Sequence, residues 1–93
     1  MEKIDELKKY SNFDEVKKLG KKYGINDIQI STHKDKKYMI LHNGKYIHFG
    51  QMGYEDYTKH RDLHRRELFR KRNHKWADAE KYSAAFLSYY LLW

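Results

Sequence analysis

The sequence predicts a single α+β domain over residues 1–93: N-terminal helices, a three-stranded antiparallel meander with an Asn-Gly hairpin, a long basic helix and a C-terminal aromatic helix. Two changes in apolar spacing predict this order. Apolar residues recur every three or four positions in residues 1–24, every second position in residues 25–50, and every three or four positions again in residues 54–93. The length suits one small domain, and the 16% of aromatic residues predicts a thin aromatic core.

The N-terminal segment is predicted to form two short helices, or one kinked helix, between residues 2 and 23. The apolar pattern is interrupted at Ser11-Asn12, where a polar side chain can act as the N-cap of a second helix. The two acidic residues that follow lie in the first turn, where the helix dipole favours them. Gly24 is the expected helix stop, with Gly20 as an earlier alternative.

The clearest local signal is Asn43-Gly44, which lies between two alternating runs, KKYMILH and KYIHFG. Asn-Gly predicts a two-residue type I′ turn, because both residues tolerate the positive φ angles that this turn requires. Such a turn sets the facing pairs: His42 with Lys45, Leu41 with Tyr46, Ile40 with Ile47, Met39 with His48, and Tyr38 with Phe49. One face is then predicted to be core and carries Tyr38, Ile40, Ile47 and Phe49. The opposite, amphipathic face is a candidate contact surface and carries Met39, Leu41, Tyr46 and His48. Residues 27–32 supply the third strand.

The central basic helix is predicted to run from residue 55 to about residue 73, with Glu55 or Asp56 as its cap. One side of its helical wheel is predicted to be the core seam and carries Tyr57, His60, His64 and Leu68. Residues 77–93 are predicted to form a last helix with an aromatic stripe. Its apolar end, Leu91-Leu92-Trp93, is expected either to close the core or to dock on a neighbouring protein.

The charge of the chain points to an anionic partner. The formal net charge is +7, and residues 55–75 carry eight Lys or Arg against four acidic residues and contain every arginine of the chain. Arginine clusters suit bidentate contacts with phosphates or carboxylates. The predicted nucleic-acid-binding residues are Arg61, Arg65, Arg66, Arg70, Lys71, Arg72 and Lys75. Aromatic side chains for base stacking are offered by Tyr46, Tyr54, Phe69 and Trp76, with Arg65 and Arg72 on the flank near the last two.

Two other interpretations of the charge stay open. The helix could simply be solubilised by charge, with Asp62 and Glu67 pairing locally with neighbouring basic residues. An acidic protein surface is also a physically suitable target for the arginines. Both interpretations concern the basic residues of the central helix.

A metal site is the main enzymatic alternative. Asp56, His60 and His64 stand at successive four-residue steps, so that one helix would align a carboxylate and two imidazoles. With His48 or His74 nearby, such a set could hold a divalent ion for phosphodiester hydrolysis. Against this, a cap role for the carboxylate and a buried, hydrogen-bonded role for His60 are simpler. We therefore expect no catalytic residues, no metal and no cofactor.

Other catalytic patterns are not found in the sequence. The chain has no cysteine, its serines lack the glycine-flanked nucleophile elbow, and it has no phosphate-binding glycine loop. Its first residues lack the apolar run of a signal peptide, and no apolar run approaches the roughly 20 residues of a membrane span. The expectation is an intracellular, non-enzymatic protein that is not secreted.

The run GKYIHFGQMGYEDYTKHRDLHRRELFRKRNHKW, followed by AAFLSYYLLW, resembles a family of small uncharacterised basic proteins from giant nucleocytoplasmic large DNA viruses and some phages. The matching positions are Gly44-Lys45, His48-Phe49-Gly50, Asp56-Tyr57-Thr58 with His60 and Asp62, Arg65-Arg66, Ala85-Phe86-Leu87-Ser88 and Leu91-Leu92-Trp93. Phe69 replaces a tyrosine of that pattern, and Arg72-Asn73-His74 contains an extra asparagine. The resemblance covers about residues 37–93 and supplies no activity.

The resemblance implies a viral source, with the protein inside the infected host cell or within the virion. The leading prediction is a structural or virion-associated protein that binds nucleic acid, with DNA as the first choice, through its arginine-rich helix. The alternative is a minor capsid or scaffold protein whose Leu91, Leu92 and Trp93 contact other virion proteins. A metal-dependent nuclease ranks third, and the oligomeric state is left open.

Overall fold

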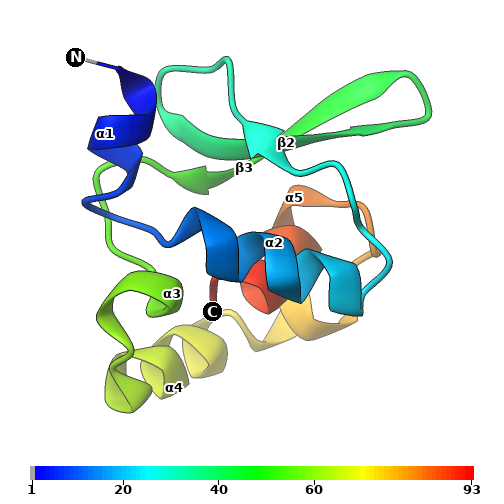
Figure 1. Cartoon of the computed structure of the whole chain (residues 1–93). Helices are drawn as coiled ribbons and strands as arrows, with labels where there is room; N and C mark the ends of the chain where they lie inside the picture. Colours follow the sequence, from blue (N-terminus) through cyan, green and yellow to red (C-terminus); the bar gives the residue numbers. More distant parts are fainter. Residues whose placement is uncertain (1) are drawn as a thin grey trace.

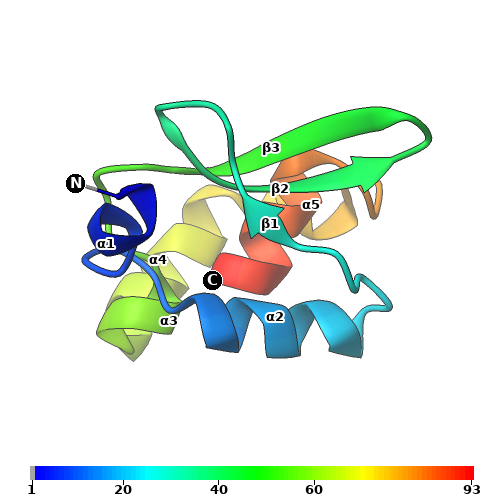
Figure 2. The same cartoon turned by 45° about the horizontal axis from the view of Figure 1, so that its top comes forward.

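A three-stranded antiparallel sheet forms one layer of the structure, and helices cover one of its faces (Figures 1 and 2). The computed structural model describes residues 2–93 and has the predicted α+β class. In chain order the elements are α1 (Lys3–Leu7), α2 (Phe13–Lys22), β1 (Gln29–Ile30), β2 (Lys36–His42), β3 (Lys45–Gln51), α3 (Tyr57–His60), α4 (Leu63–Arg72), the 3-10 helix η1 (His74–Asp78), α5 (Ala84–Leu87) and the π-helix η2 (Ser88–Leu92).

The predicted hairpin is confirmed in turn and register. Asn43 and Gly44 have φ angles of 51° and 78°, as a type I′ turn requires. The strand partners are the predicted ones: His42 with Lys45, Leu41 with Tyr46, Ile40 with Ile47, Met39 with His48, and Tyr38 with Phe49. The third strand lies in the predicted place beside β2 but spans only two residues. It ends early because the Ser31 Oγ accepts a hydrogen bond from the His33 N–H at 2.9 Å, which turns the chain away.

The N-terminal segment forms two helices, the first of the two alternatives. The Asn12 side chain accepts a hydrogen bond from the Glu15 N–H at 3.2 Å and so caps α2, as predicted. After Lys22 the chain leaves the helix, and Gly24 adopts a φ of 77°, which a residue with a side chain rarely adopts. The predicted stop at Gly24 is therefore confirmed.

The predicted long basic helix is wrong, because the helix is broken after four residues. Arg61 adopts a left-handed conformation with φ 57° and separates α3 from α4. Asp62 then starts α4 afresh: its carboxylate accepts hydrogen bonds from the N–H groups of His64 at 3.0 Å and Arg65 at 3.2 Å. The His60 Nδ1 accepts the Asp62 N–H at 2.9 Å and stabilises the break.

The predicted core seam is also wrong for α4. Tyr57 and His60 of α3 are half-buried, but His64 and Leu68 of α4 are exposed. The break changes the helix axis, so the four-residue spacing no longer keeps these side chains on one face. Every residue of α4 keeps part of its surface in contact with solvent. The helix therefore lies on the surface of the molecule and does not pass through its core.

The C-terminal segment closes the core, but its helix begins later than predicted: α5 continues directly into the π-helix η2, and the 3-10 helix η1 ends before them. Leu91 and Leu92 are almost fully buried in η2, which lies between the sheet and α2 (Figure 2). The prediction that these two leucines contact a partner protein is therefore wrong, because their side chains are buried inside this chain. Trp93 is half-buried and stacks on Phe69, with ring centroids 4.3 Å apart.

The core joins the N-terminal helices, the sheet and the C-terminal segment. Its buried members are Leu7, Val16, Ile25, Ile28, Tyr38, Ile40, Phe49, Met52, Leu87, Leu91 and Leu92. Three of the four predicted hairpin core residues are among them, and the fourth, Ile47, packs against the cluster half-buried. On the opposite face Leu41 and Tyr46 are exposed, as a contact surface requires, whereas Met39 is buried. Among residues 2–93, no helix combines the length and apolarity needed to cross a membrane.

Candidate functional site

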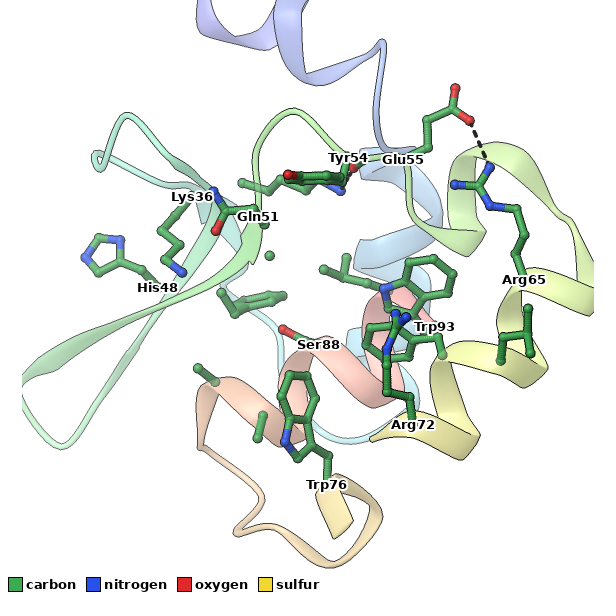
Figure 3. Close-up of a pocket in the computed structure, with 18 residues that line it drawn as sticks. Lys36, His48, Gln51, Tyr54, Glu55, Arg65, Arg72, Trp76, Ser88 and Trp93 are labelled. Carbon is green, nitrogen blue, oxygen red and sulfur yellow. Dashed lines mark hydrogen bonds and ion pairs between the residues drawn. The ribbon is translucent and has the colours of Figure 1, made fainter. Parts of the chain in front are cut away.

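A cleft of about 650 Å³ opens between β3, α4 and the C-terminal segment (Figure 3). Aromatic and basic side chains dominate its lining. The aromatic ones are Phe49, Tyr54, Phe69, Trp76 and Trp93, and the basic ones are Lys36, Lys37, Arg65 and Arg72, beside one acidic residue, Glu55. Its volume is in the range of pockets that hold small organic ligands. This cleft is the candidate functional site.

The aromatic wall of the cleft is built around Phe69. The Trp93 ring stacks on it at an interplanar angle of 6°, and the Trp76 ring meets it edge-on at a centroid distance of 5.9 Å. Both arrangements are favourable for aromatic pairs. Trp76 is 36% exposed and Tyr54 is 70% exposed, and Figure 3 shows them on opposite sides of the opening. Two aromatic rings that face solvent thus flank a packed aromatic interior.

The basic rim of the cleft is supplied by α4 and by the start of β2. Arg72 takes part in none of the ion pairs formed within residues 2–93, and its side chain extends toward Trp93 (Figure 3). Arg65 lies 3.7 Å from Glu55, but both side chains are exposed, so water screens the pair. Lys36 completes the rim from the sheet. The sequence prediction that Arg65 and Arg72 share a flank with Phe69 and Trp76 is confirmed by this shared cleft.

Arg66 and Arg70 lie elsewhere and do not line this cleft. The Arg66 Nε donates to the main-chain oxygen of Trp93 at 2.6 Å, and an Arg70 Nη donates to the same oxygen at 3.0 Å. Their guanidinium groups also lie over the rings of Tyr57, at 4.7 Å, and Tyr89, at 5.1 Å. Each of these half-buried arginines thus gives one hydrogen bond to the Trp93 main chain and lies away from the cleft, and for them the phosphate contact stays a prediction.

The remaining predicted basic residues surround the site at a distance. Arg61 lies 3.5 Å from Glu15 and over the Tyr57 ring, on the side of α3 that faces α2. Lys71 and Lys75 are exposed and do not line the cleft. These two lysines can attract an anion at long range, but they do not contact the interior of the cleft.

A buried ion pair holds the edge of the cleft in place. The Lys37 Nζ lies 3.0 Å from an Asp56 carboxylate oxygen, with exposures of 2% and 1% for the two side chains. The same ammonium donates to the main-chain oxygen of Tyr54 at 2.6 Å. Burial lowers the pKa of Lys37 from its usual value, and the charge of Asp56 opposes that shift. The pair therefore anchors the strand-to-helix loop that carries Tyr54.

This pair is part of a larger buried network. The Thr58 hydroxyl donates to the Asp56 carboxylate and accepts the Asn12 N–H at 3.0 Å. The Tyr38 hydroxyl donates to the Ser11 Oγ at 2.6 Å, which lies 3.2 Å from the Thr58 Oγ1. Burial raises the pKa of Tyr38, so its proton is retained for this hydrogen bond. The Asp-Tyr-Thr motif therefore joins the sheet to the link between α1 and α2.

The metal-site hypothesis fails on geometry. Asp56 is occupied by Lys37 and Thr58, and the break at Arg61 places His64 on a different helix from His60. Within residues 2–93, no group of three His, Cys, Asp or Glu side chains is arranged to hold a metal ion. The two additional candidates are engaged elsewhere: the His48 ring lies 2.7 Å from the Ser31 Oγ and stacks on His33, and the His74 Nδ1 lies 3.3 Å from the Lys71 main-chain oxygen.

Sequence reasoning missed several residues of the cleft. Gln51, Ser88, Lys36 and Lys37 line it, but no motif or spacing distinguishes them from other polar residues of the chain. Lys37 lies on the outward face of the hairpin by alternation, which indicates exposure and not burial. Its burial could have been inferred from two features taken together. Lys37 lies beside core residues, and a loop further along the chain carries an acidic residue, Asp56, that can pair with it.

The chain belongs to a family of unknown function (DUF5754), whose model matches residues 26–73. The match covers β1 to α4 and so includes the hairpin, the Lys37–Asp56 pair and both arginines of the cleft rim. No curated protein and no solved structure matches the chain. The family description names neither an activity nor a source, and the viral origin implied by the sequence resemblance stays a prediction.

Proposed function

We propose that this chain binds nucleic acid, acting by binding and not by catalysis, and that the contact is centred on the cleft. The observation that carries this proposal is the combination of exposed aromatic rings and basic side chains around one opening: Tyr54 and Trp76 on its sides, with Lys36, Arg65 and Arg72 on its rim. Nucleic acids present both of the matching groups, phosphates and flat bases.

The electrostatic part of the binding comes from the whole chain. A net charge of +7 attracts a polyanion at long range, and each phosphate contact releases condensed counterions. The affinity is therefore expected to fall steeply as salt is added. The local part comes from Arg72, whose guanidinium has no carboxylate partner within residues 2–93 and presents several donors to a phosphate.

The test is a titration of a fluorescein-labelled DNA strand by fluorescence anisotropy, repeated between about 50 and 200 mM salt. Wild-type protein should bind at low salt, and log Kd should rise linearly with the logarithm of the salt concentration. Arg72→Ala should reduce the slope by roughly 0.7, the share of one phosphate contact on a single strand.

Lys18→Ala is the matched control for that titration. Lys18 is an exposed residue of α2 that does not line the cleft, and its loss changes the net charge by the same amount. It should weaken binding less than Arg72→Ala and leave the slope nearly unchanged. Absence of binding at low salt, or equal effects of the two variants, would contradict the proposed site.

A second candidate function, contact with other proteins, is supported by one observation on the hairpin. Leu41 and Tyr46 face each other across β2 and β3, and both are exposed. Neighbouring apolar side chains that are exposed in this way often mark a surface that contacts another protein. This pair replaces the buried Leu91 and Leu92 as the place for a structural or virion contact. Sedimentation of the wild type against Leu41→Ser at increasing concentration tests it: self-association that the variant abolishes supports the assembly role.

A further inference from the structure

The cleft has the volume of a pocket for a small organic group. A volume of about 650 Å³ with aromatic walls can enclose a nucleobase, which in a duplex stays stacked and paired and is out of reach. The phosphates of a duplex could contact Arg72 and Lys36, but its bases are stacked and paired and so are not free to stack on Trp76. The aromatic part of the site is therefore useful only to an unpaired strand.

The exposed rings are placed to stack on such a base. Phe69 is covered by Trp93 on one face and by the edge of Trp76, so its ring supports the wall from behind. Trp76 and Tyr54 keep exposed surface on the two sides of the opening (Figure 3). Aromatic rings of this kind stack on any base, because every base offers a flat π face.

Polar side chains between the rings can meet the edge of the base. Gln51 and Ser88 both line the cleft, and Figure 3 shows Ser88 between Tyr54 and Trp76 in the view into the opening. The Gln51 amide has donors and an acceptor, and the Ser88 hydroxyl can act as either. These two groups are positioned to satisfy the polar edge of a base that leaves water.

Both walls of the cleft are held before any ligand arrives. The Lys37 ammonium fixes the Tyr54 main chain by a 2.6 Å hydrogen bond and is itself paired with Asp56. On the other side, Arg66 and Arg70 hold the main chain of Trp93. A preformed site loses little conformational freedom on binding, which favours affinity for a small, flat group.

Resting on the nucleic-acid-binding function proposed above, we infer that the cleft takes an unpaired nucleobase and makes the chain selective for single-stranded nucleic acid. The base stacks against Trp76 and Tyr54, while Arg72 and Lys36 contact the phosphates on either side of it. Selectivity for single strands arises because a duplex can satisfy the basic rim but not the aromatic wall.

The experiment compares three labelled ligands at one salt concentration: a single strand, the duplex of the same sequence, and a single strand in which abasic sites replace the central bases. Abasic sites keep the phosphates and remove the stacking groups. The single strand should bind roughly tenfold more tightly than either of the other two, as expected for the loss of one stacked base. Anisotropy titrations measure all three.

Variants of the aromatic wall complete the test. Trp76→Ala should weaken single-strand binding by roughly tenfold and leave duplex binding unchanged, whereas Trp76→Phe should keep most of the affinity. Tyr54→Ala provides a second variant at a still more exposed position, where misfolding is least expected. Circular dichroism melts of each variant establish that the fold is intact.

The outcomes separate the two levels of the proposal. Equal affinity for the single strand, the duplex and the abasic strand, with no effect of Trp76→Ala, would overturn the base seat and leave general nucleic-acid binding standing. Failure to bind any of them at low salt would overturn both. Poly-glutamate serves as a competitor: if it displaces the single strand as well as unlabelled strand does, the occupant is an acidic chain and the inference is wrong.

Discussion

The arginines on two faces of α4 have different roles. Arg66 and Arg70, one turn apart, face the C-terminal segment and donate to the main-chain oxygen of Trp93. Arg65 and Arg72, two turns apart, face the cleft and remain exposed. The difference shows that a run of arginines is not one binding surface. What each guanidinium meets after folding decides whether it stabilises the protein or remains available to a ligand.

The largest loss of stability is expected from a substitution of Asp56, whose buried carboxylate pairs with Lys37. Asp56→Ala leaves the Lys37 ammonium buried without its partner, which costs about 3–5 kcal/mol of unfolding free energy. Urea denaturation measures this loss. Glu55→Ala, one residue away and exposed, is the control and should change stability by less than about 0.5 kcal/mol. Equal stabilities of the two variants would show that the buried pair does not anchor the loop.

The next effect tests the two faces of α4 directly. Arg70→Ala should lower the unfolding free energy by about 1.5–3 kcal/mol, because it removes a charged hydrogen bond to the Trp93 main chain. Arg72→Ala should leave stability within about 0.5 kcal/mol of wild type and weaken nucleic-acid binding instead. Thermal or urea unfolding and anisotropy titrations measure both properties of both variants. If the two substitutions have the same effects, the comparison of the two faces is wrong.

A smaller effect concerns pH, through His60 at the break before α4. Burial lowers the pKa of His60 from 6.5, and the charge of Arg65 adds to this against the opposing carboxylates of Asp62, Glu55 and Asp56. Protonation would also remove the Nδ1 acceptor of the Asp62 N–H.

The unfolded chain therefore binds this proton more readily than the folded protein, and stability should fall as the pH drops below about 6.5. His60→Gln should flatten this part of the pH profile in urea denaturation. His64→Gln, at an exposed position, should not. A profile that is unchanged by His60→Gln would remove His60 as its source. His48, whose pKa burial also lowers, would be the next residue to replace.

The smallest effect should come from the one acidic residue of the cleft. Glu55→Gln releases Arg65 from its exposed ion pair and removes a negative charge from the rim. Stability should change by less than about 1 kcal/mol, because exposed pairs contribute little. Affinity for a single strand should rise roughly twofold at low salt and converge with wild type at high salt, where the charge is screened. Weaker binding by this variant would place the ligand away from Arg65.

Much of the fold follows from local signals in the sequence. Asn43-Gly44 determines the turn, and the alternation on both sides determines which hairpin residues enter the core. The cap at Asn12 and the stop at Gly24 are equally local. The break at Arg61 was not predicted, because the residues around it favour a continuous helix. Only the competing cap at Asp62 and the acceptor on His60 make two helices more stable than one.

The candidate site, like the fold, was only partly predictable from the sequence. The sequence by itself determined that the chain is basic, that its arginines lie in one segment, and that Arg65 and Arg72 lie near Phe69 and Trp76. Only the tertiary structure brought in Lys36, Gln51 and Ser88, turned Arg66 and Arg70 toward Trp93, and buried Asp56 against Lys37. The physical reason is range: turns and caps depend on neighbours along the chain, whereas burial and ion pairing depend on residues that meet only when the sheet and the helices pack together.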